Sequence, residues 1–426
     1  MAKPKNIILI TVDSLRRDFV GCYDERGKGL TPNMGEFAEK SVVFESAIAQ
    51  GSYTRSSVPS FFTSTYPWKL KPGGDISGRP TLATVLKDND YNTAFYHSNP
   101  FLSKALGYNR GFDVFDDSLL PWNINLSQKR TRQLGRLFRI ARKAPYLPAE
   151  SLVKKSVSWL ERATEPYFLW LHLMDPHGPY QRQDGGYLEK FRAERLWQKA
   201  VNSPADISDE ERDKLIESYR SEVNYADKQV GRLLEYLSEA EEDNVVVITA
   251  DHGEEFGEHG DFSHNPKPFD ELIRVPFLLN VPDGEGERVK DQLALLDLLP
   301  SLLDLARVDW EDNEFDGATF APLFSEGGWE GREHVICQPG PDLICLRTEG
   351  WKFVVKNEER MLYDLENDPG EKKDVSGARE DLVEKFERIL AEKESEYGSS
   401  EDFPEGSLGQ DEDEETRKRL EDLGYL

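Results

Sequence analysis

The sequence predicts an α/β fold in which helices cover both faces of a mostly parallel β-sheet. Runs at Asn6–Val12, Tyr167–His172 and Asn244–Ala250 are almost continuously apolar, which is typical of strands buried on both faces. Segments with helical spacing alternate with these runs, and alternating strands and helices favour a parallel sheet. Polar side chains follow each of the three runs. The same edge of the sheet is therefore expected to carry a ligand site.

The remaining elements of this large α/β part follow the same logic in chain order. Further strands are expected at Val42–Phe44, Asn92–Tyr96 and Pro276–Val281. The polar excursion from Gln181 to Asp206 is left without an assigned element. Helices are expected where apolar residues recur about every 3.6 positions, at Asn33–Ser41, Thr54–Ser64, Thr81–Asp88, Ala149–Ala163, Ser208–Leu237 and Gln292–Leu305.

The pattern changes after about residue 330. His334–Val355 predicts two or three short strands with turns between them, and Asp381–Ala391 predicts a helix. We therefore predict a large domain over residues 1–325 and a small subdomain of antiparallel sheet plus helix over 326–398. An acidic tail follows at 399–426.

Composition and charge exclude several classes of protein. There are 53 Lys and Arg against 80 Asp and Glu, and the formal net charge of −27 argues against a nucleic-acid binder. The three cysteines have no paired spacing, which argues against a disulfide scaffold and a thiolate zinc site. No apolar run reaches the roughly 18 residues of a membrane span. The first apolar run is too short for a signal peptide, so a cytoplasmic location is expected.

Asp13, Asp251, His252 and His264 form the strongest cluster of candidate site residues. Asp13 and Asp251-His252 stand at the ends of two predicted strands. Oxygen and nitrogen ligands of this kind suit one divalent cation, namely Mg, Mn, Ca or Zn. The alternative for an Asp after a strand is a helix N-cap, and this alternative has most weight for Asp13.

A second group comes from the segment LHLMDPHGPY, with His172, Asp175 and His177. His172 lies inside the apolar run and is interpreted as a core histidine. Asp175 precedes a proline, so turn formation is the alternative to a functional role. His177 is interpreted as a direct contact to substrate.

A third group is the hydroxyl-rich stretch Ser52–Ser60, at the start of a predicted helix. A helix N-terminus presents free N–H groups to an anion. A hydroxyl there, next to a metal ion, could ionise and act as a nucleophile. The alternative is an ordinary helix cap.

Segments between residue 5 and about residue 375 carry a family resemblance. They are NIILITVDSLRRDFVGCY, TPNMGEFAEKSVVFESAIAQGSYTRSSVPSFFTS, YNTAFYHSNP, FLWLHLMDPHGPY, VVVITADHGEEFGEHGDFSH, VPFLLNVP, WKFVV and LYDLENDPGE. In this order they resemble the sulfatase branch of the alkaline-phosphatase-like superfamily. The resemblance implies the alkaline-phosphatase-like fold and a metal-dependent, arylsulfatase-like hydrolase in the first domain. The implied substrate is an anionic ester, namely a sulfated or phosphorylated sugar, lipid or small molecule.

This sequence departs from the family at the nucleophile. Family members usually carry Cys or Ser in a Cys/Ser-x-Pro-x-Arg motif, which is oxidised to formylglycine. Ser57 begins a literal match, Ser-Val-Pro-Ser, but Phe61 then replaces the Arg. Counting back from the Thr that closes the family's helix, here Thr63, places Thr54 at the nucleophile instead. Threonine cannot give formylglycine, so the implied chemistry is direct attack by the Thr54 oxygen.

The resemblance also implies roles for the other site residues. Asp13, Thr54, Asp251 and His252 would hold the metal, with Mn or Zn favoured over Ca because Asp-His replaces the common Asp-Asn. His177 and His264 would contact the substrate oxyanion or protonate the leaving group. Weaker candidates for substrate binding are Arg16, Ser57 and Asn99, and Asp175 could serve a second metal.

Two other activities remain alternatives to ester hydrolysis by a sulfatase. One is a phosphodiesterase, phosphonate hydrolase or phospho-group transferase of the same superfamily. The other is a non-catalytic relative that only binds anions, which the altered nucleophile segment motivates. No pattern in the sequence indicates an oligomeric state or the identity of the substrate.

The segment Lys129–Lys143 is unusual because it holds seven basic residues and no acid. One interpretation is a basic cover over the site that attracts anionic polymers or membrane headgroups. The other is a surface helix that pairs with the protein's own acidic residues.

Overall fold

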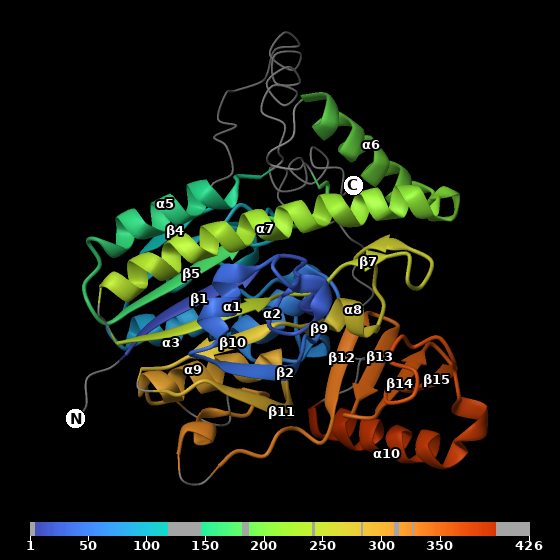
Figure 1. Ribbon diagram of the computed structural model, residues 1–426. Coiled ribbons are helices and arrows are strands. Elements are labelled where there is room, and N and C mark those ends of the chain that lie inside the picture. Colours follow the sequence, from blue (N-terminus) through green and yellow to red (C-terminus); the bar gives the residue numbers. More distant parts are fainter. Residues whose placement is uncertain are drawn as a thin grey trace, which may run out of the picture.

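The computed structural model of the protein describes residues 5–117, 146–180, 187–240, 243–282, 284–310, 315–325 and 328–397. The basic segment Lys129–Lys143 and the acidic tail lie outside the described residues. A large sheet forms the centre of the molecule, with strands in the order β11-β2-β10-β6-β1-β5-β3-β4 and β9 beside β2 (Figure 1). Its strands are β1 Asn6–Val12, β2 Val42–Ile48, β3 Asn92–Tyr96, β4 Val114–Asp116, β5 Tyr167–Leu173, β6 Asn244–Ala250, β9 Arg274–Val275, β10 Phe277–Asn280 and β11 Glu287–Ala294.

The three most apolar strands lie together at the middle of this sheet. Strand β1 pairs in parallel with β5 on one side and with β6 on the other. All seven residues of each of these strands are buried. Strands covered on both faces must be apolar throughout, which explains their continuous apolar runs. Their carboxyl ends deliver Asp13, Asp251 and the segment after Leu173 to one edge of the sheet.

Helices cover both faces of the sheet, so the predicted fold class is confirmed (Figure 1). Helices α1 and α5 each contact α7 on one face, whereas α2 and α3 each contact α9 on the opposite face. Helix α7 begins with a capping box in which the Ser208 hydroxyl accepts from the Glu211 amide. The helices are α1 Pro32–Ala38, α2 Thr54–Thr63, α3 Leu82–Asp88, α5 Ala149–Leu160, α6 Tyr187–Asn202, α7 Asp209–Glu239, α8 Asp270–Ile273, α9 Leu298–Ala306 and α10 Glu380–Tyr397.

A separate four-stranded antiparallel sheet follows, in the order β12-β13-β14-β15, with α10 against it (Figure 1). On one face, Phe353 packs on Phe386 of α10, with ring centroids 6.1 Å apart. The other face carries Arg347 and Lys352, which contact Asp270 of the large α/β part. The strands are β12 Val335–Gly340, β13 Leu343–Arg347, β14 Trp351–Lys356 and β15 Glu359–Asp364.

Some sequence-based expectations for single elements were wrong. The helix expected over Gln292–Leu305 begins only at Leu298, because Gln292–Ala294 end the edge strand β11. The excursion at Gln181–Asp206, left without an element, contains the 16-residue helix α6. His334–Val355 does carry three strands, as expected, but the fourth strand of the small sheet, β15, lies beyond that range and was not predicted.

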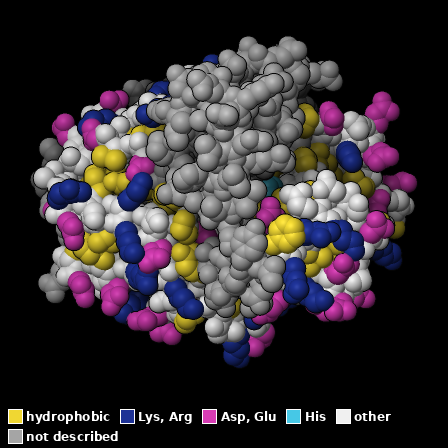
Figure 2. Space-filling view, turned by 90° about the horizontal axis from the view of Figure 1, so that it is seen from above, with side chains coloured by type: hydrophobic (Ala, Val, Ile, Leu, Met, Phe, Trp, Pro, Cys, Tyr) yellow, Lys and Arg dark blue, Asp and Glu magenta, His cyan; other side chains and the backbone are white. Residues whose placement is uncertain are grey.

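Two surface properties bear on possible partners. No helix among the described residues is long and apolar enough to cross a membrane. On the face seen from above, basic and acidic side chains are interspersed among the described residues, without a broad basic surface (Figure 2).

Candidate active site

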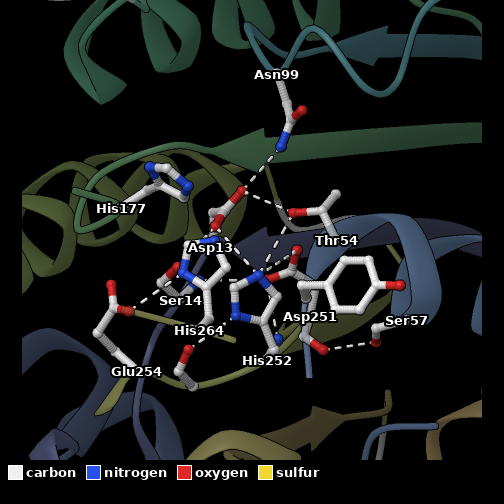
Figure 3. Close-up of polar contacts among 12 residues, drawn as sticks. Asp13, Ser14, Thr54, Ser57, Asn99, His177, Asp251, His252, Glu254 and His264 are labelled. Atoms are coloured by element: carbon white, nitrogen blue, oxygen red, sulfur yellow. Dashed lines mark hydrogen bonds and ion pairs between the residues drawn. The ribbon is translucent and has the colours of Figure 1, made fainter. Parts of the chain in front are cut away.

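Asp13 follows β1 and is fully buried at the centre of the polar cluster (Figure 3). Its Oδ2 accepts a hydrogen bond from the Asn99 amide at 2.9 Å and lies 3.3 Å from His172 Nε2. Its Oδ1 accepts from the Ser14 hydroxyl at 2.9 Å. The short helical turn that follows has Arg16, not Asp13, at its N-cap. Asp13 is therefore not a helix cap.

Asp251 and His252 follow β6 and complete the cluster from the neighbouring strand. His252 Nε2 lies 3.6 Å from Asp13 Oδ1 and 3.6 Å from Asp251 Oδ2. His252 Nδ1 contacts the Gly253 carbonyl at 2.8 Å, so this nitrogen is the donor and Nε2 is left with its lone pair. Asp251 Oδ2 is buried and has no hydrogen-bond partner.

Thr54 is the first residue of α2, and its side chain points into the cluster (Figure 3). Thr54 Oγ1 lies 3.4 Å from Asp13 Oδ2 and 3.4 Å from His252 Nε2. Tyr53, not Thr54, is the N-cap of α2, and no side chain caps this helix. The structure therefore brings Thr54, Asp13 and His252 together, as the assignment of the nucleophile to Thr54 requires. It leaves the alternative that Thr54 is a helix cap unsupported.

The donor atoms of Asp13, Asp251 and His252 fit a divalent cation. One ligand atom from each of the three lies within 4.8 Å of the other two, and all three residues are buried. Two carboxylates and one imidazole are ligands that Mn²⁺ and Zn²⁺ accept. The unpartnered Asp251 Oδ2 is the observation that most favours a cation here, because a buried polar atom without a partner is costly.

Burial and neighbouring charged groups shift the pKa values of Asp13, Asp251 and His252. Burial would raise the pKa of Asp13, but His177, His172 and His252 outweigh it and lower that pKa. Burial and the nearby Asp13 charge raise the pKa of Asp251 to about 7. Burial and the neighbouring His264 lower the pKa of His252 to about 3, so its imidazole is neutral. A neutral imidazole beside two carboxylates is the protonation state that metal ligands require.

His177 and His264 lie beside this cluster (Figure 3). Their ring centroids are 4.9 Å apart, and His264 lies 4.6 Å from the ring of His252. His177 Nδ1 contacts the Gly178 carbonyl at 2.6 Å, and burial lowers the pKa of His177. Burial also opposes protonation of His264, but the Glu254 carboxylate, 3.2 Å from Nδ1, raises its pKa. Two imidazoles with oppositely shifted pKa values suit separate acid and base roles.

The other predicted site residues fall into two sets. Asn99 joins the site through Asp13, and the Ser57 hydroxyl donates to the Asp251 carbonyl at 2.6 Å. Arg16 is instead paired with Asp18 at 2.8 Å and with Glu258 at 2.6 Å, which neutralises its charge.

Asp175 lies apart from the three candidate ligands as a cap of helix α5. Its Oδ2 accepts from the Ala149 amide, the first residue of that helix, at 2.9 Å. Burial and the nearby Glu222 raise its pKa to about 8. Among the described residues, Asp175 belongs to no group of three potential metal ligands, which removes the support for a second metal there.

Sequence reasoning missed two residues of the site. His172 was interpreted as core, yet its Nε2 faces Asp13. Its position one residue before the end of a buried strand was an available signal. Glu254 was not singled out from the sequence, because its spacing to His264 gives no indication that the two side chains meet.

Comparison with known proteins identifies the family. The model of the sulfatase family matches residues 5–308, so the chain belongs to the sulfatase family. Membership places it among the hydrolases of sulfuric and phosphoric esters, in a family that is metal-dependent. An uncharacterised sulfatase of Escherichia coli, YidJ, is 24% identical over 87% of this chain and 82% of the relative. An arylsulfatase of Clostridium perfringens is 27% identical over 61% of this chain and 60% of the relative.

Solved structures show the same fold. One is a protein in complex with its substrate D-glucosamine-2-N,6-O-disulfate, with a TM-score of 0.73, 18% identity, and coverage of 93% of this chain and 98% of that one. Another is a phosphonate monoester hydrolase of Agrobacterium radiobacter, with a TM-score of 0.71, 20% identity, and coverage of 91% and 95%. These likenesses confirm the alkaline-phosphatase-like architecture of the chain.

Proposed function

We propose that the protein is a metal-dependent hydrolase of sulfate or phosphate esters that uses Thr54 as its nucleophile. The observation that carries the proposal is the position of Thr54 Oγ1, 3.4 Å from both Asp13 and His252. Asp13, Asp251 and His252 would hold one divalent cation, and these ligands favour Mn²⁺ or Zn²⁺ over Ca²⁺. A cation bound there would stabilise negative charge on the reacting oxygens and lower the pKa of a hydroxyl.

The residues of the chain have distinct parts in the proposed reaction. The Thr54 hydroxyl gives its proton to a water molecule, and its oxygen forms a bond to sulfur or phosphorus while the bond to the ester oxygen breaks. The departing oxygen takes a proton from His264, whose pKa is raised beside Glu254. His177 contacts an oxygen of the transferred group. Water then hydrolyses the ester on Thr54, which releases sulfate or phosphate and restores the hydroxyl.

For the substrate, we propose an ester of a sulfated or phosphorylated sugar, lipid or small molecule. The relatives support a sulfate ester, since they include an arylsulfatase and a protein solved with a disulfated glucosamine. A phosphonate monoester or phosphate diester is the second candidate, favoured by the Asp251-His252 pair and by two phosphonate monoester hydrolases with the same fold.

The test is hydrolysis by the metal-free chain after addition of Mn²⁺, Zn²⁺ or Ca²⁺. Aryl sulfates, phosphate diesters and phosphonate monoesters are offered in parallel, with a chelator as the control. We expect turnover of at least one class that requires Mn²⁺ or Zn²⁺. A chain that binds no metal and turns over none of them would contradict the proposal and favour the anion-binding relative.

A further inference from the structure

Strand geometry places four polar or aromatic side chains in one row beneath the candidate metal site. Thr11 of β1 and His172 of β5 are direct partners in the parallel ladder. Side chains two positions apart in a strand share a face of the sheet. Trp170 therefore lies on the same face as His172, and Asp13 follows Thr11 at the end of β1.

Hydrogen bonds connect this row from Trp170 to Asp13. The Trp170 indole N–H donates to Thr11 Oγ1 at 2.9 Å, and Thr11 Oγ1 lies 2.8 Å from His172 Nδ1. His172 Nε2 lies 3.3 Å from Asp13 Oδ2. An indole N–H only donates, and a carboxylate only accepts. Each hydrogen bond from Trp170 to Asp13 then has a donor and an acceptor if the Thr11 hydroxyl donates to Nδ1 and His172 carries its proton on Nε2, toward Asp13.

The row is anchored in the core at its other end. Thr11, Trp170, His172 and Asp13 all have no exposed surface. The Trp170 ring stacks on Phe95 of β3, with centroids 3.9 Å apart and planes 3° apart. His172 is therefore held by a packed scaffold, and its N–H has a fixed direction.

We infer that His172 is a positioning residue that fixes the Asp13 carboxylate for metal binding. The inference rests on the metal site of the proposed function. Asp13 Oδ2 receives two N–H groups from different directions, one from Asn99 on the loop after β3 and one from His172 on β5. Two donors on one oxygen restrict rotation of the carboxylate. Asp13 Oδ1, which accepts from the Ser14 hydroxyl, then keeps its remaining lone pair on the side of His252.

A purely structural role for His172 explains less of this arrangement. A Leu or Phe at this position of β5 would fill the volume without burying two polar nitrogens. Hydrogen-bonding partners behind a metal ligand typically change metal affinity by about 10- to 100-fold when they are removed. His172 has this relation to Asp13, whereas its neighbours in β5 face the core.

Three variants separate the hydrogen bond from packing. His172→Phe keeps a ring but removes the donor to Asp13, and His172→Gln keeps an N–H near the position of Nε2. Thr11→Val keeps the imidazole but removes its Nδ1 partner. Tyr167→Phe is the matched control, because it removes a buried hydrogen bond to Asn244 at the far end of the same strand.

The measurement is the Kd for Mn²⁺ of the full-length, metal-free chain by titration calorimetry, with thermal unfolding in chelator as a check on folding. We expect Kd to rise about 10- to 100-fold for His172→Phe and by a smaller factor for Thr11→Val. It should stay within about threefold for His172→Gln and Tyr167→Phe. If His172→Phe does not fold, the Thr11→Val variant still tests the chain of hydrogen bonds.

The outcomes separate this inference from the proposed function. Wild-type affinity for Mn²⁺ in folded His172→Phe or in Thr11→Val would overturn this inference but not the proposed function. The same holds if His172→Gln binds Mn²⁺ as weakly as His172→Phe does. A wild-type chain without Mn²⁺ affinity would overturn both. The expected series of Kd values in a chain that hydrolyses none of the tested esters would support the role of His172 and contradict the proposed function.

Discussion

Two buried polar clusters of this molecule differ in charge balance, since one pairs cations with carboxylates and the other holds carboxylates without a cation. Where the small sheet meets the large α/β part, the Lys352 amine is fully buried and contacts Asp270 at 2.6 Å and Glu371 at 2.7 Å. Arg347 contacts the same Asp270 at 2.8 Å. At the candidate active site, the carboxylates of Asp13 and Asp251 lie beside the neutral imidazole of His252, and Asp251 Oδ2 has no hydrogen-bond partner.

The difference indicates what each cluster does. Opposite charges at the interface compensate one another, which holds the small sheet in place. Like charges at the active site cost free energy of folding unless a cation binds between them, because burial and Asp13 together raise the pKa of Asp251. We therefore expect the unbalanced cluster to carry the function, and changes in the two clusters should affect different measurements.

The largest effect is expected at the active-site cluster. Thr54→Ala removes the proposed nucleophile and should lower kcat at least about 10³-fold, with little change in the free energy of unfolding. The measurement is turnover of the best ester substrate with saturating metal. Ser57→Ala is the matched control on the same helix and should lower kcat by less than about tenfold. Activity that survives Thr54→Ala but not Ser57→Ala would move the nucleophile to Ser57.

At the interface cluster, Lys352→Met should instead act on stability. The substitution leaves Asp270 and Glu371 without their buried counter-charge, and it should lower the free energy of unfolding by about 3–5 kcal/mol. Denaturant unfolding measures this loss. Lys87→Met breaks an exposed ion pair with Asp113 and should cost less than about 1 kcal/mol. Equal losses in the two variants would contradict the comparison of the clusters.

A substitution at His264 tests whether this residue of the active-site cluster protonates the leaving group. If His264 protonates the leaving oxygen, His264→Ala should lower kcat about 10²-fold for an alkyl ester. The loss should be much smaller for a nitrophenyl ester, whose leaving group needs no proton. Steady-state kinetics on the two esters give the ratio. An equal loss on both would assign His264 to binding of the transferred group instead.

The central sheet could be predicted from the sequence because its buried strands consist mostly of apolar residues. Asn6–Val12, Tyr167–Leu173 and Asn244–Ala250 are almost continuously apolar, and this pattern is typical of a strand covered on both faces. Edge elements gave weaker signals. Strand β11 is mostly exposed over its first five residues and buried from Gln292 onward, where it runs into the apolar residues Leu295 and Leu296 ahead of α9. The boundary at Ala294 therefore has no marker of its own.

The site could be predicted only where residue type and strand position agreed. Asp13, Asp251 and His252 end strands that are neighbours in the sheet, so their meeting follows from the topology. Arg16 stands close in sequence to Asp13, but its pairing with Glu258 depends on a loop more than 200 residues away. Contacts such as His264 with Glu254 depend on loop geometry, which periodicity does not encode.

The smallest of the four effects concerns the pH dependence of the interface cluster. Burial would raise the pKa of Asp270, but Arg347 and Lys352 outweigh it and hold that pKa well below its usual value. A carboxylate with a lowered pKa stabilises the fold above its unfolded pKa of about 3.9, and this contribution is lost as pH falls further. Stability should therefore decline below about pH 4.

The variant Asp270→Asn isolates this contribution from that of Glu371. Glu371 acts in the opposite sense, because burial raises its pKa despite the charge of Lys352. The Asn variant should be less stable than wild type at neutral pH, and its free energy of unfolding should fall less steeply between pH 5 and pH 3. Urea unfolding across that range gives both slopes. Asp113→Asn serves as the exposed control, and parallel curves for wild type and Asp270→Asn would show that Asp270 does not anchor the interface.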